Sequence, residues 1–274
     1  MKNLGTIKAY RVAKETPLGY MISDGEKEYF LHRSETLYQD IKTGDVVEAF
    51  LYLDKKNRLA ATLHKPRVTT ESFAFAPVAA VLPGAGVFVD IGISKDILLS
   101  KDDLPREEEN WPRPGDFLPV RLKVKAGRLI AKLLAREELP QSEKSGLEGE
   151  TEGYVYMLYR EGVLLLTGTY DFISVHTGPR GGFRLGQKLS VRITDQDERG
   201  YRGILTDSFV DADKEAILAY LRRHHGMMKL TDKSSPDLIY RHFKISKKAF
   251  KSALGRLYKE KRIEILPDKI ILIE

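Results

Sequence analysis

Three glycines, Gly44, Gly115 and Gly186, recur at an interval of 71 residues. Each begins a stretch of alternating apolar and polar residues, and each stretch leads through a turn into a second, shorter apolar run. A fixed period indicates one structural unit that is used several times. This period is too long for a solenoid repeat and suits a small β-barrel. The repeat therefore predicts three related β-domains, followed by a C-terminal segment of a different kind.

Short strands separated by turn residues fill each of the three repeats. Residues 46–53 alternate, for example, and the polar turn at 54–57 returns the chain into an apolar run at 59–63. About five such strands per repeat predict a sandwich or a small barrel. A closed barrel also removes the exposed sheet edges that a small β-domain must protect. We expect the three domains to span residues 1–65, 70–136 and 150–210.

Residues 211–274 show a helical period instead. Ile217, Leu218 and Leu221 predict one helix, and Ser235 followed by Pro236 predicts the start of a second. The inner face of this second helix is expected to hold Leu238, Ile239 and Phe243. A third helix is predicted after Ser246, with an apolar stripe of Phe250, Ala253, Leu254, Leu257 and Tyr258. Two apolar runs around Pro267 predict a hairpin, and three helices with a hairpin are typical of a winged helix domain.

The positive charge of the chain is concentrated in this last segment. The whole sequence has a net charge of +6, and residues 211–274, with 15 basic and 9 acidic residues, account for all of it. Residues 241–262 contain nine basic residues and one acid. Such a concentration indicates a polyanionic partner. The alternative is a solvated, lysine-rich helix face without a ligand.

Several classes of function find no support in the sequence. The chain has no cysteine, which excludes disulfides, thiolate metal sites and cysteine nucleophiles, and its six histidines have no metal-ligand spacing. No phosphate-binding loop or nucleophile elbow is present, and no apolar run approaches the ~18 residues that span a membrane. We expect no catalytic residue, no metal, no cofactor, no small-molecule substrate and no membrane partner. A start without an apolar signal core predicts a cytoplasmic location.

Motifs in all three repeats resemble the S1-type RNA-binding domain, which is an OB-fold barrel. The second repeat carries residues 86–92 (GVFVDIG) and 95–100 (KDILLS), the third has Gly153, Val155, Leu158 and Gly162, and the first has residues 31–35 (LHRSE). This resemblance implies three tandem OB-fold, S1-like barrels. With the winged helix predicted from the helical pattern of residues 211–274, the expected fold is multidomain and mainly β, with three barrels followed by an α+β winged helix domain. Ser100 departs from the pattern, because it replaces the histidine that the first repeat keeps as His32.

A barrel that binds single-stranded nucleic acid needs exposed rings for base stacking and nearby cations for the backbone. Tyr154 and Tyr156 lie two residues apart, so both are expected on one face of a strand, with Val155 towards the core. The alternative is that these are ordinary half-buried strand aromatics. The predicted RNA-binding residues of the barrels, some of them implied by the resemblance, are Tyr154, Tyr156, Arg180, Arg184, Arg202, Phe88, Arg128, His32 and Arg58.

Basic residues on the predicted third helix lie away from its apolar stripe or at its edges, as on a helix that enters a groove. They are Lys247, Lys248, Lys251, Arg256, Lys259 and Arg262. Lysine and arginine at these positions would bind phosphates and confer little sequence specificity.

Residues 246–259 (SKKAFKSALGRLYK) resemble the C-terminal domain of the conserved virulence factor B family, as do the number and order of the domains. The resemblance implies a cytoplasmic RNA-binding protein that affects gene expression. The sequence therefore predicts a noncatalytic protein that binds single-stranded RNA with little sequence preference, with DNA as a possible second ligand. Two alternatives stay open: a winged-helix DNA-binding transcriptional regulator, and an adaptor that binds the ribosome or RNA polymerase.

Overall fold

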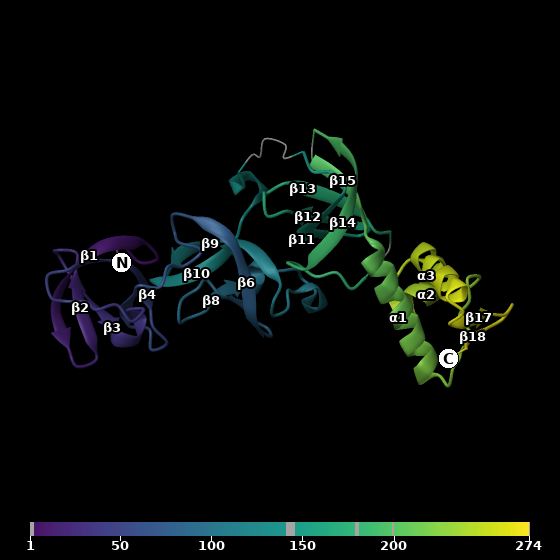
Figure 1. Ribbon diagram of the computed structural model, residues 1–274, viewed down its shortest axis with the longest axis horizontal. Helices are drawn as coiled ribbons and strands as arrows, with labels where there is room; N and C mark the ends of the chain where they lie inside the picture. Colours follow the sequence, from purple (N-terminus) through teal and green to yellow (C-terminus); the bar gives the residue numbers. More distant parts are fainter. Residues whose placement is uncertain (1–2, 141–145, 179–180, 199, 274) are drawn as a thin grey trace. The chain divides into compact units, whose positions relative to one another are not determined.

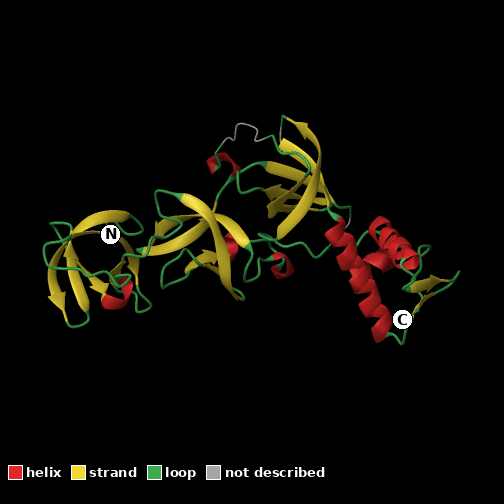
Figure 2. Ribbon diagram, viewed as in Figure 1, coloured by secondary structure: helices red, strands yellow, loops and turns green. Residues whose placement is uncertain are grey.

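The computed structural model describes residues 3–140, 146–178, 181–198 and 200–273. The chain divides into two compact units, Met1–Pro140 and Gln141–Glu274. The first unit contains two β-barrels, and the second contains a third barrel and a helical domain (Figures 1 and 2). The predicted mainly β, multidomain fold is confirmed.

The three barrels have the same topology. In each, five strands close in the order first, second, third, fifth, fourth, and the third and fifth strands pair in parallel. This is the five-stranded arrangement of an OB-fold.

The first barrel comprises β1 (Ile7–Thr16), β2 (Gly19–Ser23), β3 (Glu28–His32), β4 (Val46–Leu53) and β5 (Leu59–Thr62). The second comprises β6 (Phe73–Leu82), β7 (Gly86–Val89), β8 (Ile97–Ser100), β9 (Phe117–Lys125) and β10 (Arg128–Leu133). The third comprises β11 (Glu150–Tyr159), β12 (Gly162–Leu166), β13 (Phe172–His176), β14 (Lys188–Asp197) and β15 (Gly200–Leu205).

The glycines of the 71-residue repeat occupy equivalent places in the three barrels. Each has a positive φ and donates its backbone N–H to the carbonyl oxygen of a valine beside a β-bulge in the first strand. The bonds run from Gly44 to Val12 (2.8 Å), from Gly115 to Val78 (2.9 Å) and from Gly186 to Val155 (2.7 Å). A left-handed backbone suits glycine, and a bulge bends the strand that carries it. The repeated glycine therefore marks the position in each barrel that forms a backbone hydrogen bond to the bent first strand beside its bulge.

Each barrel has its own apolar core. In the first barrel Val12, Ile22 and Leu31 are fully buried, and in the third Val155 and Leu165 are. Trp111, the single tryptophan of the chain, is buried in the second barrel, where its indole N–H donates to the carbonyl oxygen of Pro105 (2.7 Å). Cores of this size stabilise small domains modestly.

The C-terminal domain contains α1 (Asp207–Arg223), α2 (Pro236–Phe243) and α3 (Lys247–Lys259), with a sheet of order β16-β18-β17. Its strands are β16 (Met227–Met228), β17 (Ile263–Ile265) and β18 (Ile270–Leu272). Ser235 and Ser246 cap α2 and α3, as their positions predict. β16 was not expected, because a two-residue strand leaves no periodic signal. The predicted winged helix is confirmed.

Two residues assigned to the inner faces of these helices lie outside instead. Leu238 in α2 is 42% exposed and Tyr258 in α3 is 57% exposed. Ile239 and Leu257, their neighbours in the sequence, are the fully buried residues. Tyr258 follows Phe250 by eight residues, and at 3.6 residues per turn this rotates it ~80° away from Phe250 on the helix. The aromatic ring therefore adds to the outer face of α3.

Candidate nucleic-acid interface

The strand register places equivalent residues on the second and third strands of each barrel. The cross-strand pairs are Met21 with Phe30, Phe88 with Leu98, and Leu164 with Ser174. Phe30 and Phe88 are half-buried, so each of the first two barrels presents one aromatic ring from this pair. The third barrel presents none from it, since neither Leu164 nor Ser174 is aromatic. Its aromatic residues come from other positions.

In the first barrel, His32 ends β3 and caps the short helical turn that follows it. The Nδ1 atom of His32 lies 3.1 Å from the backbone N of Ser34, which donates to it, and the ring packs edge-on to Phe30 at 6.0 Å. Ser100 does the same in the second barrel, because its hydroxyl oxygen accepts a hydrogen bond from the backbone N–H of Asp102 (3.3 Å). The replacement of histidine by Ser100 thus preserves the cap. His32 is exposed and lies beside Phe30.

Arg58 follows the β4–β5 turn and is paired with the acid that begins this turn. Its Nη2 atom lies 2.7 Å from the Asp54 carboxylate, and its Nε–H also donates to that group. Hydrogen bonds from the backbone N–H of Arg58, aided by its guanidinium and by the N–H of Lys56, lower the pKa of Asp54. Arg58 is exposed, but a phosphate must compete with Asp54 for it.

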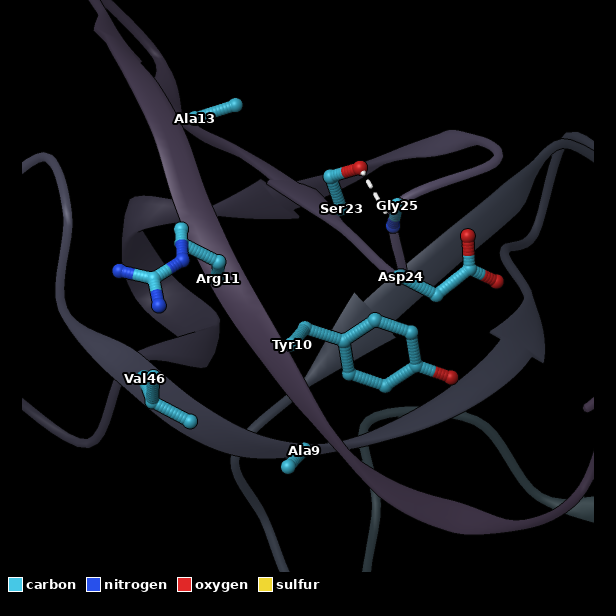
Figure 3. A pocket seen from close by; sticks show the side chains of 8 residues that line it. All are labelled: Ala9, Tyr10, Arg11, Ala13, Ser23, Asp24, Gly25 and Val46. Atoms are coloured by element: carbon cyan, nitrogen blue, oxygen red, sulfur yellow. Dashed lines mark hydrogen bonds between the residues drawn. The ribbon is translucent and has the colours of Figure 1, made fainter.

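The first barrel also contains a hollow of about 380 Å³ between β1 and the β2–β3 turn. Figure 3 shows Tyr10 and Asp24 on one side of the β1 ribbon and Arg11 on the other. The Asp24 carboxylate accepts hydrogen bonds from the N–H groups of Glu26 and Lys27 and from the Tyr29 hydroxyl. These bonds lower the pKa of Asp24, chiefly those from the two backbone groups. Asp24, the acid of this hollow, therefore already stabilises the β2–β3 turn.

In the second barrel, Phe88 and Arg128 line one hollow together with Lys95. Phe88 lies on β7 and Arg128 begins β10, so two strands bring a ring and a guanidinium to the same place. Phe88 is half-buried and Arg128 is exposed. This is the combination that stacks a base and holds its backbone.

In the third barrel, Tyr154 and Tyr156 lie on either side of Val155, which is fully buried. Both tyrosines are half-buried, and Tyr156 is the extra residue of the β11 bulge. The Tyr156 ring packs edge-on to Phe172 with the ring centres 5.4 Å apart. The bulged position is occupied by Ala13 and Ala79 in the other barrels. The third barrel thus carries a tyrosine where the other two have only a methyl group.

The arginines of the third barrel differ in their exposure and in their hydrogen-bond and ion-pair partners. Arg202 is exposed and forms ion pairs with Asp195 (3.1 Å) and Asp197 (2.7 Å), which raise its pKa, with Asp197 as the main cause. Arg184 is half-buried, and its backbone N–H donates to the side-chain oxygen of Gln187 (3.2 Å). Arg180 lies outside the described residues. Arg202 therefore resembles Arg58, since both are partly neutralised by nearby acids: Asp195 and Asp197 in β14, and Asp54 at the β4–β5 turn.

On α3 the apolar and basic faces are separate. Phe250, Ala253, Leu254 and Leu257 are buried in the core of the domain, whereas Lys248, Lys251 and Lys259 are exposed. Lys251 lies 3.7 Å from the Asp232 carboxylate. Lys247 and Arg256 are half-buried at the edge of the basic face. Arg262 was predicted on this helix, but α3 ends at Lys259, and Arg262 is a half-buried residue that immediately precedes β17. α3 thus presents an outer face of lysines that also includes Tyr258.

Four candidate residues were missed by sequence reasoning: Phe30, Lys95, Phe172 and Tyr258. Phe30 precedes His32 by two residues, and this spacing places both on one face of a strand. Lys95 and Phe172 gave no such signal, since their roles depend on contacts with distant residues. Among the described residues, no cluster of histidine, aspartate or glutamate has the geometry of a metal site. No helix in the described ranges is long and apolar enough to cross a membrane.

Three OB-type barrels and a basic winged helix define a multidomain nucleic-acid-binding protein. Residues 4–64 match the S1 domain, residues 73–132 the CvfB first S1-like domain, and residues 215–272 the CvfB-like winged helix domain. The CvfB first S1-like domain therefore corresponds to the second barrel of this chain.

Similar proteins extend this agreement to most of the chain. The protein named YitL of Bacillus subtilis is 35% identical over 91% of this chain and 87% of its own length. Conserved virulence factor B of Staphylococcus epidermidis is 32% identical over 88% of this chain and 85% of its own. A crystal structure of a multidomain protein with nucleic acid binding domains from Streptococcus pneumoniae is 31% identical, with a TM-score of 0.65 over 100% of this chain and 99% of that one. The chain belongs to the conserved virulence factor B family.

Proposed function

We propose that this chain is a noncatalytic RNA-binding protein that binds single-stranded RNA along its barrels and its basic winged helix and regulates gene expression after transcription. The observation that carries the proposal is the pairing of half-exposed rings with cations on the barrel strands. Phe88 with Arg128 is the clearest pair. Domains of these two classes are typical of noncatalytic nucleic-acid-binding proteins.

Exposed rings favour a single strand over a duplex. Bases in a duplex are stacked on one another, whereas those of a single strand can stack on protein side chains. Phe30, Phe88, Tyr154 and Tyr156 are all half-buried, which leaves part of each ring open to a base. Such stacking depends little on which base is bound, so we expect weak sequence preference.

The lysines of α3 supply the electrostatic part of the affinity. Lys248, Lys251 and Lys259 are exposed on one helix and can bind successive phosphates. Arg58 and Arg202 contribute less, because Asp54, Asp195 and Asp197 already partly neutralise them. Several weak sites on one chain bind a strand tightly through their high effective concentration.

A second candidate function is supported by the same helix. α3 with its outer lysines has the form of a helix that enters the major groove of DNA. In that case the winged helix binds duplex DNA and the protein acts as a transcriptional regulator. A preference for duplex DNA over single-stranded RNA at the same salt concentration would favour this function.

The test changes Tyr154 and Tyr156 together, and compares leucine with phenylalanine. Leucine keeps apolar contact with Phe172 but has no aromatic face, whereas phenylalanine keeps the face and loses only the hydroxyl. We expect the double leucine variant to bind single-stranded RNA ~5- to 150-fold more weakly per stacked base, and the double phenylalanine variant to bind like the wild type. Equal affinity of the leucine variant and the wild type would remove the third barrel from the site.

The role in gene expression has its own test. Ultraviolet crosslinking in cells, followed by sequencing of the bound RNA, should recover messenger RNAs with the wild-type chain and few with the double leucine variant. Recovery of DNA alone would support the transcriptional alternative.

A further inference from the structure

Lys95 and the Tyr52–Ser94 pair connect the first two barrels. The Lys95 ammonium, which precedes β8 in the second barrel, donates to the backbone carbonyl oxygens of Leu53 (2.9 Å) and Asp54 (3.0 Å) in the first. Beside it, the Tyr52 hydroxyl lies 3.0 Å from the Ser94 hydroxyl. The β4–β5 turn of the first barrel is thereby held against the segment between β7, which carries Phe88, and β8.

A hollow of about 190 Å³ is lined in part by this lysine. Its walls include Phe88, Leu98 and Ile130 of the second barrel and Leu53 of the first. This volume is below the ~300 Å³ of typical small-molecule pockets, so a single flat group fits better than a cofactor. An aromatic ring with aliphatic neighbours is a suitable wall for a nucleobase. Asp96 also lines this hollow, and its carboxylate can accept a hydrogen bond from an N–H group of a base.

A second hollow, of about 270 Å³, is also lined by Lys95. It is lined mainly by cations, Lys55, Lys56, Arg58 and Lys95, with Asp54 as the acid. Asp54 is already paired with Arg58. Lys55 and Lys56 are exposed, and their ammonium groups form no hydrogen bond or ion pair within the described part of the chain. The second hollow therefore has a surplus of positive charge that suits a phosphate.

Lys95 belongs to both hollows and can serve both. An ammonium group has three donors, and two of those of Lys95 are used by the carbonyl oxygens of the turn. Burial lowers the pKa of Lys95, and the nearby Arg128 guanidinium lowers it further, against the opposing effect of Asp54. Two cations so close to each other attract a bound anion.

We propose that the joint between the first two barrels binds one nucleotide of single-stranded nucleic acid, with its base against Phe88 and its phosphate among Lys55, Lys56 and Lys95. This site rests on the proposed function and adds to it, because both barrels contribute to one nucleotide. The bound strand also holds the two barrels together, since its phosphate contacts the first barrel and its base the second.

The experiment measures the binding of the full chain to a labelled oligouridine of ~30 nucleotides, enough for three barrels at ~4–16 nucleotides each. One variant is Phe88→Leu, and the other is Lys55→Met with Lys56→Met, on an exposed turn where folding is not at risk. The matched control is Lys14→Met with Lys42→Met. These two side chains, 63% and 75% exposed, remove the same charge from the first barrel but line neither hollow.

We expect Phe88→Leu to weaken binding ~5- to 150-fold. The Lys55/Lys56 variant should reduce the slope of log K against log salt by ~0.7, since the site holds one phosphate and each neutralised phosphate of a single strand contributes ~0.7. The control pair should leave the slope unchanged. Photocrosslinking of an oligomer that contains 4-thiouridine should label peptides from residues 86–89 in the wild type and not in Phe88→Leu.

Wild-type affinity and slope in both variants, with no crosslink to residues 86–89, would overturn the joint site and leave RNA binding elsewhere intact. If the wild-type chain binds no single strand at all, the proposed function fails, and the joint site fails with it. Fluorescence of Trp111, which lies in the second barrel, shows whether Phe88→Leu remains folded.

Discussion

At the scale of single residues, close approach of the backbone fixes several positions of the barrels. Gly86 begins β7 with a φ of +143°, and a Cβ atom there would lie 2.1 Å from the carbonyl oxygen of Leu99. Gly19 and Gly162 begin the equivalent strands of the other barrels and face the same obstacle, at 2.2 Å and 2.4 Å. No side chain fits at that distance, so these positions accept only glycine.

Replacement of Gly86 by alanine should lower the free energy of unfolding of the second barrel by about 3 kcal/mol, from backbone strain and overpacking together. Trp111 fluorescence during urea unfolding measures this barrel selectively. Gly84→Asn is the matched control, because Gly84 has no atom within reach of an added Cβ and asparagine tolerates its φ of +74°. A shift in Gly86→Ala no larger than that of the control would contradict the argument.

The buried hydroxyl of Tyr10 leads to a second prediction, which concerns the dependence of stability on pH. It is 1% exposed, and its hydroxyl makes no hydrogen bond of good geometry within the described residues. Burial is the main cause that raises its pKa to about 12, against an opposing effect of the nearby Asn3 side chain. Because the folded pKa exceeds the ordinary value of 10.0, the neutral form is favoured in the folded state. This contribution to stability is complete below pH ~10 and is lost as the pH rises towards 12.

Tyr10→Phe should therefore leave stability at neutral pH unchanged or raise it by about 1 kcal/mol, since an unpartnered buried hydroxyl costs free energy. The difference in tyrosinate absorbance between wild type and variant should titrate with a midpoint near 12. A midpoint near 10 would show that the Tyr10 hydroxyl is solvated.

At the scale of elements, strands and helices differ in how far the sequence predicts them. The turn-and-strand pattern, the caps Ser235 and Ser246 and the apolar stripe of α3 are local signals, and the elements formed as predicted. Tyr258 and Leu238 were misplaced, because the edge of a helix face depends on which neighbours cover it. The ion pair of Arg58 with Asp54 and the hydrogen bond from Lys95 to Leu53 form only when the β4–β5 turn is folded, so the sequence did not predict them. The predicted interface residues of α3 stay predictions until binding is measured.

Lys248→Gln with Lys259→Gln tests the outer face of α3. Both side chains are exposed and form no ion pair in the part of the chain that the structure describes, so the free energy of unfolding should change by less than ~0.5 kcal/mol. Loss of two phosphate contacts should reduce the salt slope for single-stranded RNA by ~1.4. Lys229→Gln with Lys233→Gln, on exposed residues of the same domain outside α3, is the control. Equal slopes in the two pairs would mean that α3 has no special role.

At the scale of the whole molecule, the three barrels share a topology but present different outer faces. The first offers Phe30 and His32, the second Phe88 and Arg128, and the third Tyr154 and Tyr156. The repeat in the sequence is a repeat of the glycines and the core, which set the fold. The outer residues are under no such packing constraint, so their arrangement could not be predicted from the repeat.

The central claim is that the chain prefers single-stranded RNA, and one titration tests it most directly. Fluorescence anisotropy of the full chain with labelled single-stranded RNA, single-stranded DNA and duplex DNA, over a series of salt concentrations, compares the three ligands. We predict the tightest binding to RNA at every salt concentration, with log K falling linearly with log salt as phosphate contacts require. Tighter binding to duplex DNA, or no binding to any of the three, would contradict the claim.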